Sequence, residues 1–126
     1  MLLRTTTVGF ALTLLAAPAI ADGASEAVTA ETHAELASQA SDLAGVHMHL
    51  HHTVNCLVGP AGKGFDPKEM NPCANAGNGA IPDTTDAQRK IVLQNAVAEA
   101  ELGIGSSDLT EARKDATQTA SLLKGK

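Results

Sequence analysis

The most constraining feature of this 126-residue chain is a long run, from Ser25 to Val58, that contains no proline and only one glycine, Gly45. Apolar side chains recur in it with the helical period. They are Val28, Leu36, Leu43, Leu50, Val54 and Leu57. Gly45 could allow a bend, but no turn chemistry surrounds it, so we expect one helix over residues 25–58, about 50 Å long.

The rest of the chain predicts a long loop followed by a helical hairpin. Gly, Pro and Asn dominate residues 59–85, where Phe65 is the only aromatic anchor, and we expect an ordered covering loop. The helical period resumes over residues 86–102 and 108–123, and Asp108 with Glu111 forms a capping box before the last helix. No strand pattern occurs. The prediction is an all-α fold: a small three- or four-helix bundle with one long first helix, within a single domain over residues 22–126.

The amino terminus has the features of a secretory signal peptide. Residues 1–21 combine one positive charge at Arg4, a short apolar stretch and the small-x-small end Ala19-Ile20-Ala21. The apolar stretch is too short to cross a bilayer. We therefore expect cleavage after Ala21, a periplasmic or secreted location, and no membrane association afterwards. The net charge of −5 and the lack of Trp and Tyr argue against nucleic acid as a partner.

Two cysteines, Cys56 and Cys73, leave two site chemistries open. In an oxidising compartment an even pair is first interpreted as a disulfide, which for a loop of this length stabilises by about 3 kcal/mol. If reduced, the thiols could join His49 and His52 in a structural Cys₂His₂ zinc site. Export favours the disulfide.

All five histidines lie between positions 33 and 52, and four of them fall within six residues. Plotted at 100° per residue on one continuous helix, His47 lies within the apolar stripe and His51 at its edge. His49 and His52 lie on the opposite face, beside the loop. Each pair could share a metal ion because residues three or four apart on a helix are neighbours.

On the same continuous helix His33 is isolated, about 21 Å along the axis from His47. Met48 lies between the two histidine faces and, like carboxylates, could complete a ligand shell. Neutral imidazole suits copper, nickel, iron and zinc alike. We predict a metal site at His47 and His51, or at His49 and His52, with copper as the first candidate and zinc as the second.

Several cofactor and enzyme classes lack their motifs. The chain has no C-x-x-C-H, which excludes covalent haem, and no Glu-x-x-His pair at these histidines, which argues against a di-iron carboxylate site. It has no G-x-S-x-G, and oxidised thiols are not nucleophiles. We expect a protein that is not an enzyme and that buffers or delivers a metal.

Three alternatives without a metal remain open at this point. Clustered imidazoles titrate near pH 6.5 and would repel one another on acidification, so the cluster could be a pH-sensitive hinge or docking surface. The chain could also be a non-catalytic structural or interaction module whose disulfide-tied loop is the recognition surface. A long first helix would leave Val28 and Leu36 without cover, which a homodimer could supply.

The residues from His47 to Asp83 suggest relatives. His-His-Thr-Val-Asn-Cys-Leu-Val-Gly-Pro, Gly-Lys-Gly-Phe-Asp and Asn-Pro-Cys with Gly-Asn-Gly resemble a pattern in small exported proteobacterial helical proteins of unassigned function. The Ala-rich helices with placed histidines are more distantly similar to the His-rich periplasmic small metal-binding protein of nitrifying bacteria. That protein repeats His along all its helices and needs no Cys, so the similarity implies a class of function, not a site.

Overall fold

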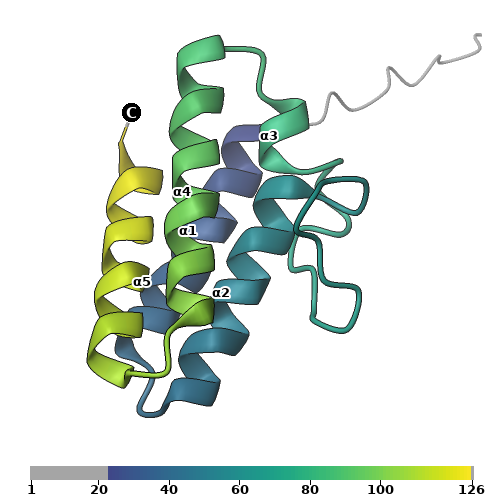
Figure 1. Cartoon of the computed structure of the whole chain (residues 1–126). Coiled ribbons are helices and arrows are strands. Elements are labelled where there is room, and N and C mark those ends of the chain that lie inside the picture. The colour runs from purple at the N-terminus through teal and green to yellow at the C-terminus, as the bar shows by residue number, and fades with distance from the viewer. Residues whose placement is uncertain (1–22, 126) are drawn as a thin grey trace, which may run out of the picture.

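The computed structural model describes residues 23–125, and this part of the chain is all-helical, as predicted. Figure 1 shows the long helices side by side, with the loop that follows α2 on one flank. The predicted signal peptide, residues 1–21, lies outside the described residues. The helices are α1 (Gly23–Gln39), α2 (Leu43–Val58), the short α3 (Ala80–Asp83), α4 (Ala87–Gly105) and α5 (Leu109–Lys124).

The expected single helix over residues 25–58 is wrong, because the chain reverses between α1 and α2. The Ala40 amide bonds to the Ala37 carbonyl at 3.2 Å and closes the last turn of α1. Asp42 then adopts an extended conformation, and its carboxylate accepts a hydrogen bond from the Gly45 amide at 2.8 Å. Asp42 is therefore an N-cap that starts a new helix. Gly45 lies in the first turn of α2 and makes no bend.

The reversal makes α1 and α2 neighbours and yields four long helices instead of three. Around the bundle, α1 contacts α2 and α5, and α4 contacts the same two helices from the other side. The C-terminal hairpin of α4 and α5 is confirmed. Asp108 is the N-cap of α5, since its carboxylate accepts from the Glu111 amide at 2.9 Å. The other half of the predicted capping box is replaced, because the Asp108 amide donates to the Ser106 hydroxyl and the Glu111 carboxylate accepts from Lys114.

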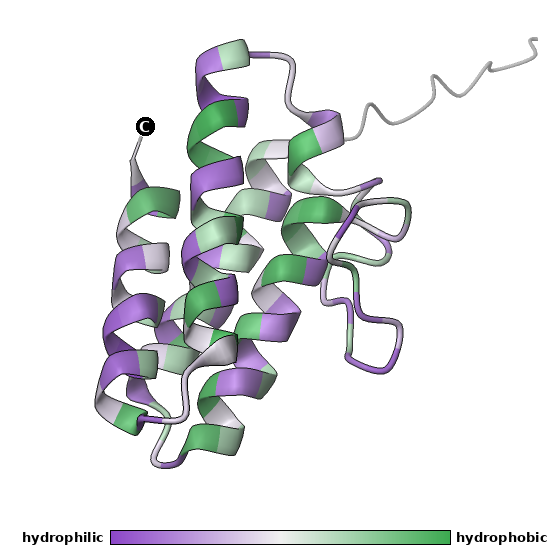
Figure 2. Ribbon diagram, viewed as in Figure 1, coloured by the Kyte–Doolittle hydropathy of each residue, from purple (hydrophilic) through white to green (hydrophobic). Residues whose placement is uncertain are grey.

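The core face of α1 consists of alanines. They are Ala27, Ala30, Ala34 and Ala37, all buried. The larger Val28 and Leu36 instead lie outside, 61% and 43% exposed. The apolar stripe predicted for this half of the run was therefore wrong, whereas Leu50 and Leu57 of α2 are buried as expected. Figure 2 shows the mixed hydropathy of the helices. A homodimer through the first helix stays a prediction.

Residues 59–79, here called the tied loop, are held against the end of α2. A disulfide joins Cys56 and Cys73, whose Cα atoms lie 5.1 Å apart, so the Cys₂His₂ alternative is excluded. Phe65 packs against the core cluster to which α1, α2, α4 and α5 all contribute. No helix within residues 23–125 is both long and apolar enough to cross a bilayer.

Candidate metal centre

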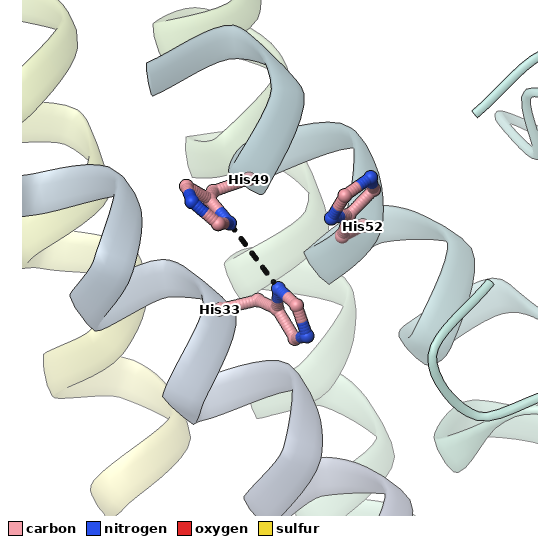
Figure 3. A group of neighbouring side chains, drawn as sticks. All are labelled: His33, His49 and His52. Carbon is pink, nitrogen blue, oxygen red and sulfur yellow. Dashed lines mark hydrogen bonds between the residues drawn. The ribbon is translucent and has the colours of Figure 1, made fainter. Parts of the chain in front are cut away.

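Three imidazoles from two helices converge on one flank of the bundle. His33 comes from α1, and His49 and His52 come from adjacent turns of α2. One nitrogen of each ring lies within 4.8 Å of one nitrogen of both others. Figure 3 shows the three rings facing a common space between the helices. This cluster could hold a metal ion.

Local contacts set the position of α1 against α2 at this level. The buried Thr53 hydroxyl lies 3.2 Å from the Ala30 carbonyl of α1 and 3.0 Å from the His49 carbonyl of α2, and donates toward both. Ala30 is one turn before His33, and Thr53 is one turn after His49. Because the alanine face lets the two helices approach closely, the His33 side chain reaches those of α2.

The rings are arranged at steep angles instead of stacking. The Nδ1 atoms of His33 and His49 lie 3.4 Å apart and share a hydrogen bond, drawn dashed in Figure 3, whose donor depends on the tautomers of the two rings. The His52 ring is edge-on to both, at interplanar angles of 81° to His33 and 90° to His49. Ring centroids are 5.2–5.8 Å apart across the three pairs. The three rings therefore do not stack on one another, and one nitrogen of each stays within 4.8 Å of the others.

His52 is the most buried member of the cluster and has an unusual hydrogen-bonding state. Its side chain is 7% exposed, and its Nδ1 atom is buried without a hydrogen-bond partner. Its other ring nitrogen, Nε2, lies 3.7 Å from a carboxylate oxygen of Glu69 in the tied loop. Buried polar atoms in proteins are nearly always satisfied, so an unpartnered nitrogen facing two other imidazoles indicates a site for a ligand.

The electrostatics of the cluster favour neutral imidazoles, the form that binds metals. Burial lowers the pKa of His33 below its ordinary 6.5, and the neighbouring His52 and His49 lower it further. Burial is also the main cause that lowers the pKa of His52, reinforced by His49 and His51 and opposed by Glu69. Both rings are therefore uncharged at neutral pH.

The structure keeps the predicted separation of His49 and His52 from His47 and His51 but adds His33 to the first pair. His49 and His52 lie together in the cluster. His47 instead contacts the Ser106 carbonyl through Nε2 at 3.0 Å, and His51 lies 3.8 Å from Asp66 through Nδ1. The expected isolation of His33 was wrong, because it assumed one continuous helix.

A sequence signal for the missed residue did exist. Ser41-Asp42, followed by a helical stretch, is an N-terminal capping signature, and an N-cap in the middle of a helical run predicts a chain reversal. A hairpin with its turn near residue 41 brings residue 33 opposite residues 49–52. The sequence separation that puts His33 far from the other histidines on one continuous helix therefore puts it opposite them in a hairpin.

No protein-family model, curated protein or solved structure matches this chain. The resemblances drawn from the sequence therefore stay predictions. What the chain can do chemically follows from the arrangement of its own residues.

Proposed function

We propose that this protein binds a divalent transition metal ion, zinc or copper, through His33, His49 and His52, and that it buffers or delivers this ion outside the cytoplasm. The observation that carries the proposal is the buried, unpartnered Nδ1 of His52 within reach of two further imidazole nitrogens. The low pKa values of His33 and His52 support it, because neither ring must lose a proton before it binds at neutral pH.

The spacing of the hydrogen-bonded donors is compatible with a tetrahedral zinc ion, and on this ground we place zinc before copper, which reverses the order expected from the sequence. Two nitrogens at tetrahedral positions around zinc, with bonds of 2.0–2.1 Å, lie about 3.3–3.4 Å apart. The Nδ1 atoms of His33 and His49 are 3.4 Å apart. Donors at a right angle, as in tetragonal copper(II), would lie about 2.9 Å apart at the same bond length. The other nitrogens, within 4.8 Å, require small ring rotations to close on the ion.

Three protein ligands leave one position of a tetrahedral zinc ion for water or an exchangeable ligand. An incomplete protein shell of this kind suits an ion that is taken up and passed on. The disulfide between Cys56 and Cys73 supports the predicted periplasmic or secreted location, because such bonds persist in oxidising compartments.

The test is calorimetric titration of the oxidised protein with Zn(II) and Cu(II), using single His→Ala variants of all five histidines. Loss of any one cluster ligand should weaken binding by at least about 100-fold, more than the loss of an outer-shell group. His47→Ala and His51→Ala are matched controls on the same helix and should bind as the wild type does. Co(II) loading should produce the visible spectrum of a tetrahedral ion.

Two outcomes would overturn the proposal. If the wild-type protein binds neither ion with a dissociation constant in the micromolar range or below, the metal proposal fails. The tied loop as an interaction surface would then be the better explanation of the function. Equal weakening by His47→Ala and by the variants of the three cluster residues would place the ion elsewhere.

A further inference from the structure

The tied loop places two carboxylates against two consecutive histidines of α2. Asp66 lies 3.8 Å from Nδ1 of His51, and Glu69 lies 3.7 Å from Nε2 of His52. The two contacts are similar in length and in exposure of the carboxylate, at 32% and 34%. They differ in the ring nitrogen that faces the carboxylate and in the burial of the histidine, since the side chain of His51 is 27% exposed and that of His52 is 7% exposed. They also differ in that His52 belongs to the three-imidazole cluster and His51 does not.

Glu69 is not attached to a loosely held segment. Asn55, fully buried on α2 one turn after His52, donates its side-chain amide toward the carbonyls of three loop residues, and its oxygen accepts from the Asp66 amide at 2.8 Å. The three carbonyls belong to Asp66, Glu69 and Met70, at 2.9, 3.3 and 3.2 Å. The disulfide at Cys56, the next residue, ties the same loop again. The backbone of Glu69 is therefore fixed relative to the ring that it faces.

We propose that Glu69 is a positioning residue for the metal centre: from its 3.7 Å contact with Nε2 of His52, a small side-chain rotation lets it accept the Nε2–H and hold the ring with the Nδ1 lone pair directed at the ion. This inference rests on the proposed function. A neutral imidazole carries one proton, and placing it on Nε2 leaves Nδ1 as the donor atom. Figure 3 shows one His52 nitrogen turned toward His33 and His49 and the other turned away from them.

An anion at this position suits the chemistry of a metal-bound imidazole. A bound dication draws electron density from the imidazole and makes the remaining N–H more acidic, and a carboxylate compensates that charge. Carboxylate–histidine–metal arrangements of this kind typically contribute 10–100-fold to affinity. Because Nδ1 and Nε2 are on opposite sides of the ring, Glu69 acts through His52 and is not itself a ligand.

The test compares Glu69→Gln and Glu69→Ala with the matched pair Asp66→Asn and Asp66→Ala. Zinc affinity is measured by calorimetry on the oxidised protein, and the His52 tautomer by ¹⁵N NMR on the zinc-free protein. We expect Glu69→Ala to weaken zinc binding by 10–100-fold and Glu69→Gln by about 10-fold, since the amide oxygen still accepts the proton but carries no charge. The Asp66 variants should change affinity by less than 3-fold.

The NMR measurement separates this proposal from the proposed function. Wild-type His52 should be the Nε2–H tautomer, and Glu69→Ala should shift it to a mixture, whether or not zinc binds. An unchanged tautomer overturns the positioning role, as does an equal loss of affinity in the Asp66 and Glu69 variants, which would indicate only a general effect of charge. Absence of zinc binding by the wild type, with the tautomer shift present, would overturn the metal function alone.

Discussion

Replacing His52 with leucine should separate the stability of this protein from its binding capacity. Leucine is similar in size and removes a buried ring nitrogen that has no hydrogen-bond partner. Burying such an atom costs about 1–3 kcal/mol. Against this gain stand the 3.7 Å contact with the one-third-exposed Glu69, worth at most about 1 kcal/mol, and a shape change of less than about 1.5 kcal/mol. We expect the metal-free His52→Leu protein to be as stable as the wild type, or up to about 2 kcal/mol more stable.

Zinc should reverse this order. At a free zinc concentration 100 times the dissociation constant, binding stabilises the wild type by about 2.7 kcal/mol. For a chain of this size that corresponds to a rise of about 10–20 °C in Tm. His52→Leu keeps only two of the three imidazoles and should show a rise of less than a few degrees. Urea unfolding without metal, at pH 8 where the ring is neutral, and thermal unfolding with and without zinc measure the two effects.

Thr53→Val is the matched control for the first effect. Thr53 is buried on the same helix, but its hydroxyl is within hydrogen-bond distance of two carbonyls, so its loss should destabilise the protein by about 1 kcal/mol. The reasoning is refuted if His52→Leu destabilises the metal-free protein by more than about 2 kcal/mol, which would identify His52 as a structural core residue. A full zinc-induced rise in Tm in His52→Leu would refute the assignment of the site.

Three further predictions concern acid, the disulfide and the loop ends. Burial and neighbouring imidazoles lower the pKa of His33 and His52 below 6.5 in the folded protein, so the unfolded chain binds more protons below that pH. The stability of the metal-free protein, measured by urea unfolding, should therefore fall as the pH drops below 6.5. This fall should be smaller in a His33→Ala, His52→Leu double variant. Reducing the disulfide should destabilise the protein by about 3 kcal/mol. It should also weaken zinc binding by about 10-fold, because the tied loop no longer fixes the carboxylate of Glu69 behind His52. An unchanged calorimetric affinity after reduction would contradict the second expectation. Gly59 has a φ of 68°, and a Cβ there would lie 1.7 Å from the Asn78 carbonyl oxygen. Gly59→Ala should therefore lower the free energy of unfolding by about 3 kcal/mol or more. A Cβ at Gly105 would meet nothing within 4 Å, so the control Gly105→Ala should change the free energy of unfolding by less than about 1 kcal/mol.

The sequence predicted the helical class, the disulfide and the C-terminal hairpin because each depends on strong local signals. Apolar periodicity, an even cysteine pair and the Asp108 N-cap all act over short distances along the chain. The break at Asp42 is equally local, but a run without proline and with a helical apolar period on both sides concealed it. Missing that one N-cap changed the partner of every residue in α1, and with it the position of His33.

The helical wheel also assigned the wrong buried face to α1, because of the amino-acid composition of this helix. It assigns the buried face from the largest apolar side chains, which on α1 are Val28 and Leu36, yet these lie outside and alanines line the core. Alanine has little area to bury, so it gives a weak pattern, but it lets two helices pack at short distance. Imidazole side chains are short, and donors from two separate helices can come within 4.8 Å only where the backbones are close. The small alanine side chains of α1, which gave only a weak sequence pattern, are thus what allows His33 to reach His49 and His52. A larger side chain on this face, as in Ala34→Leu, should separate the ligands and abolish zinc binding even in a variant that remains helical by circular dichroism.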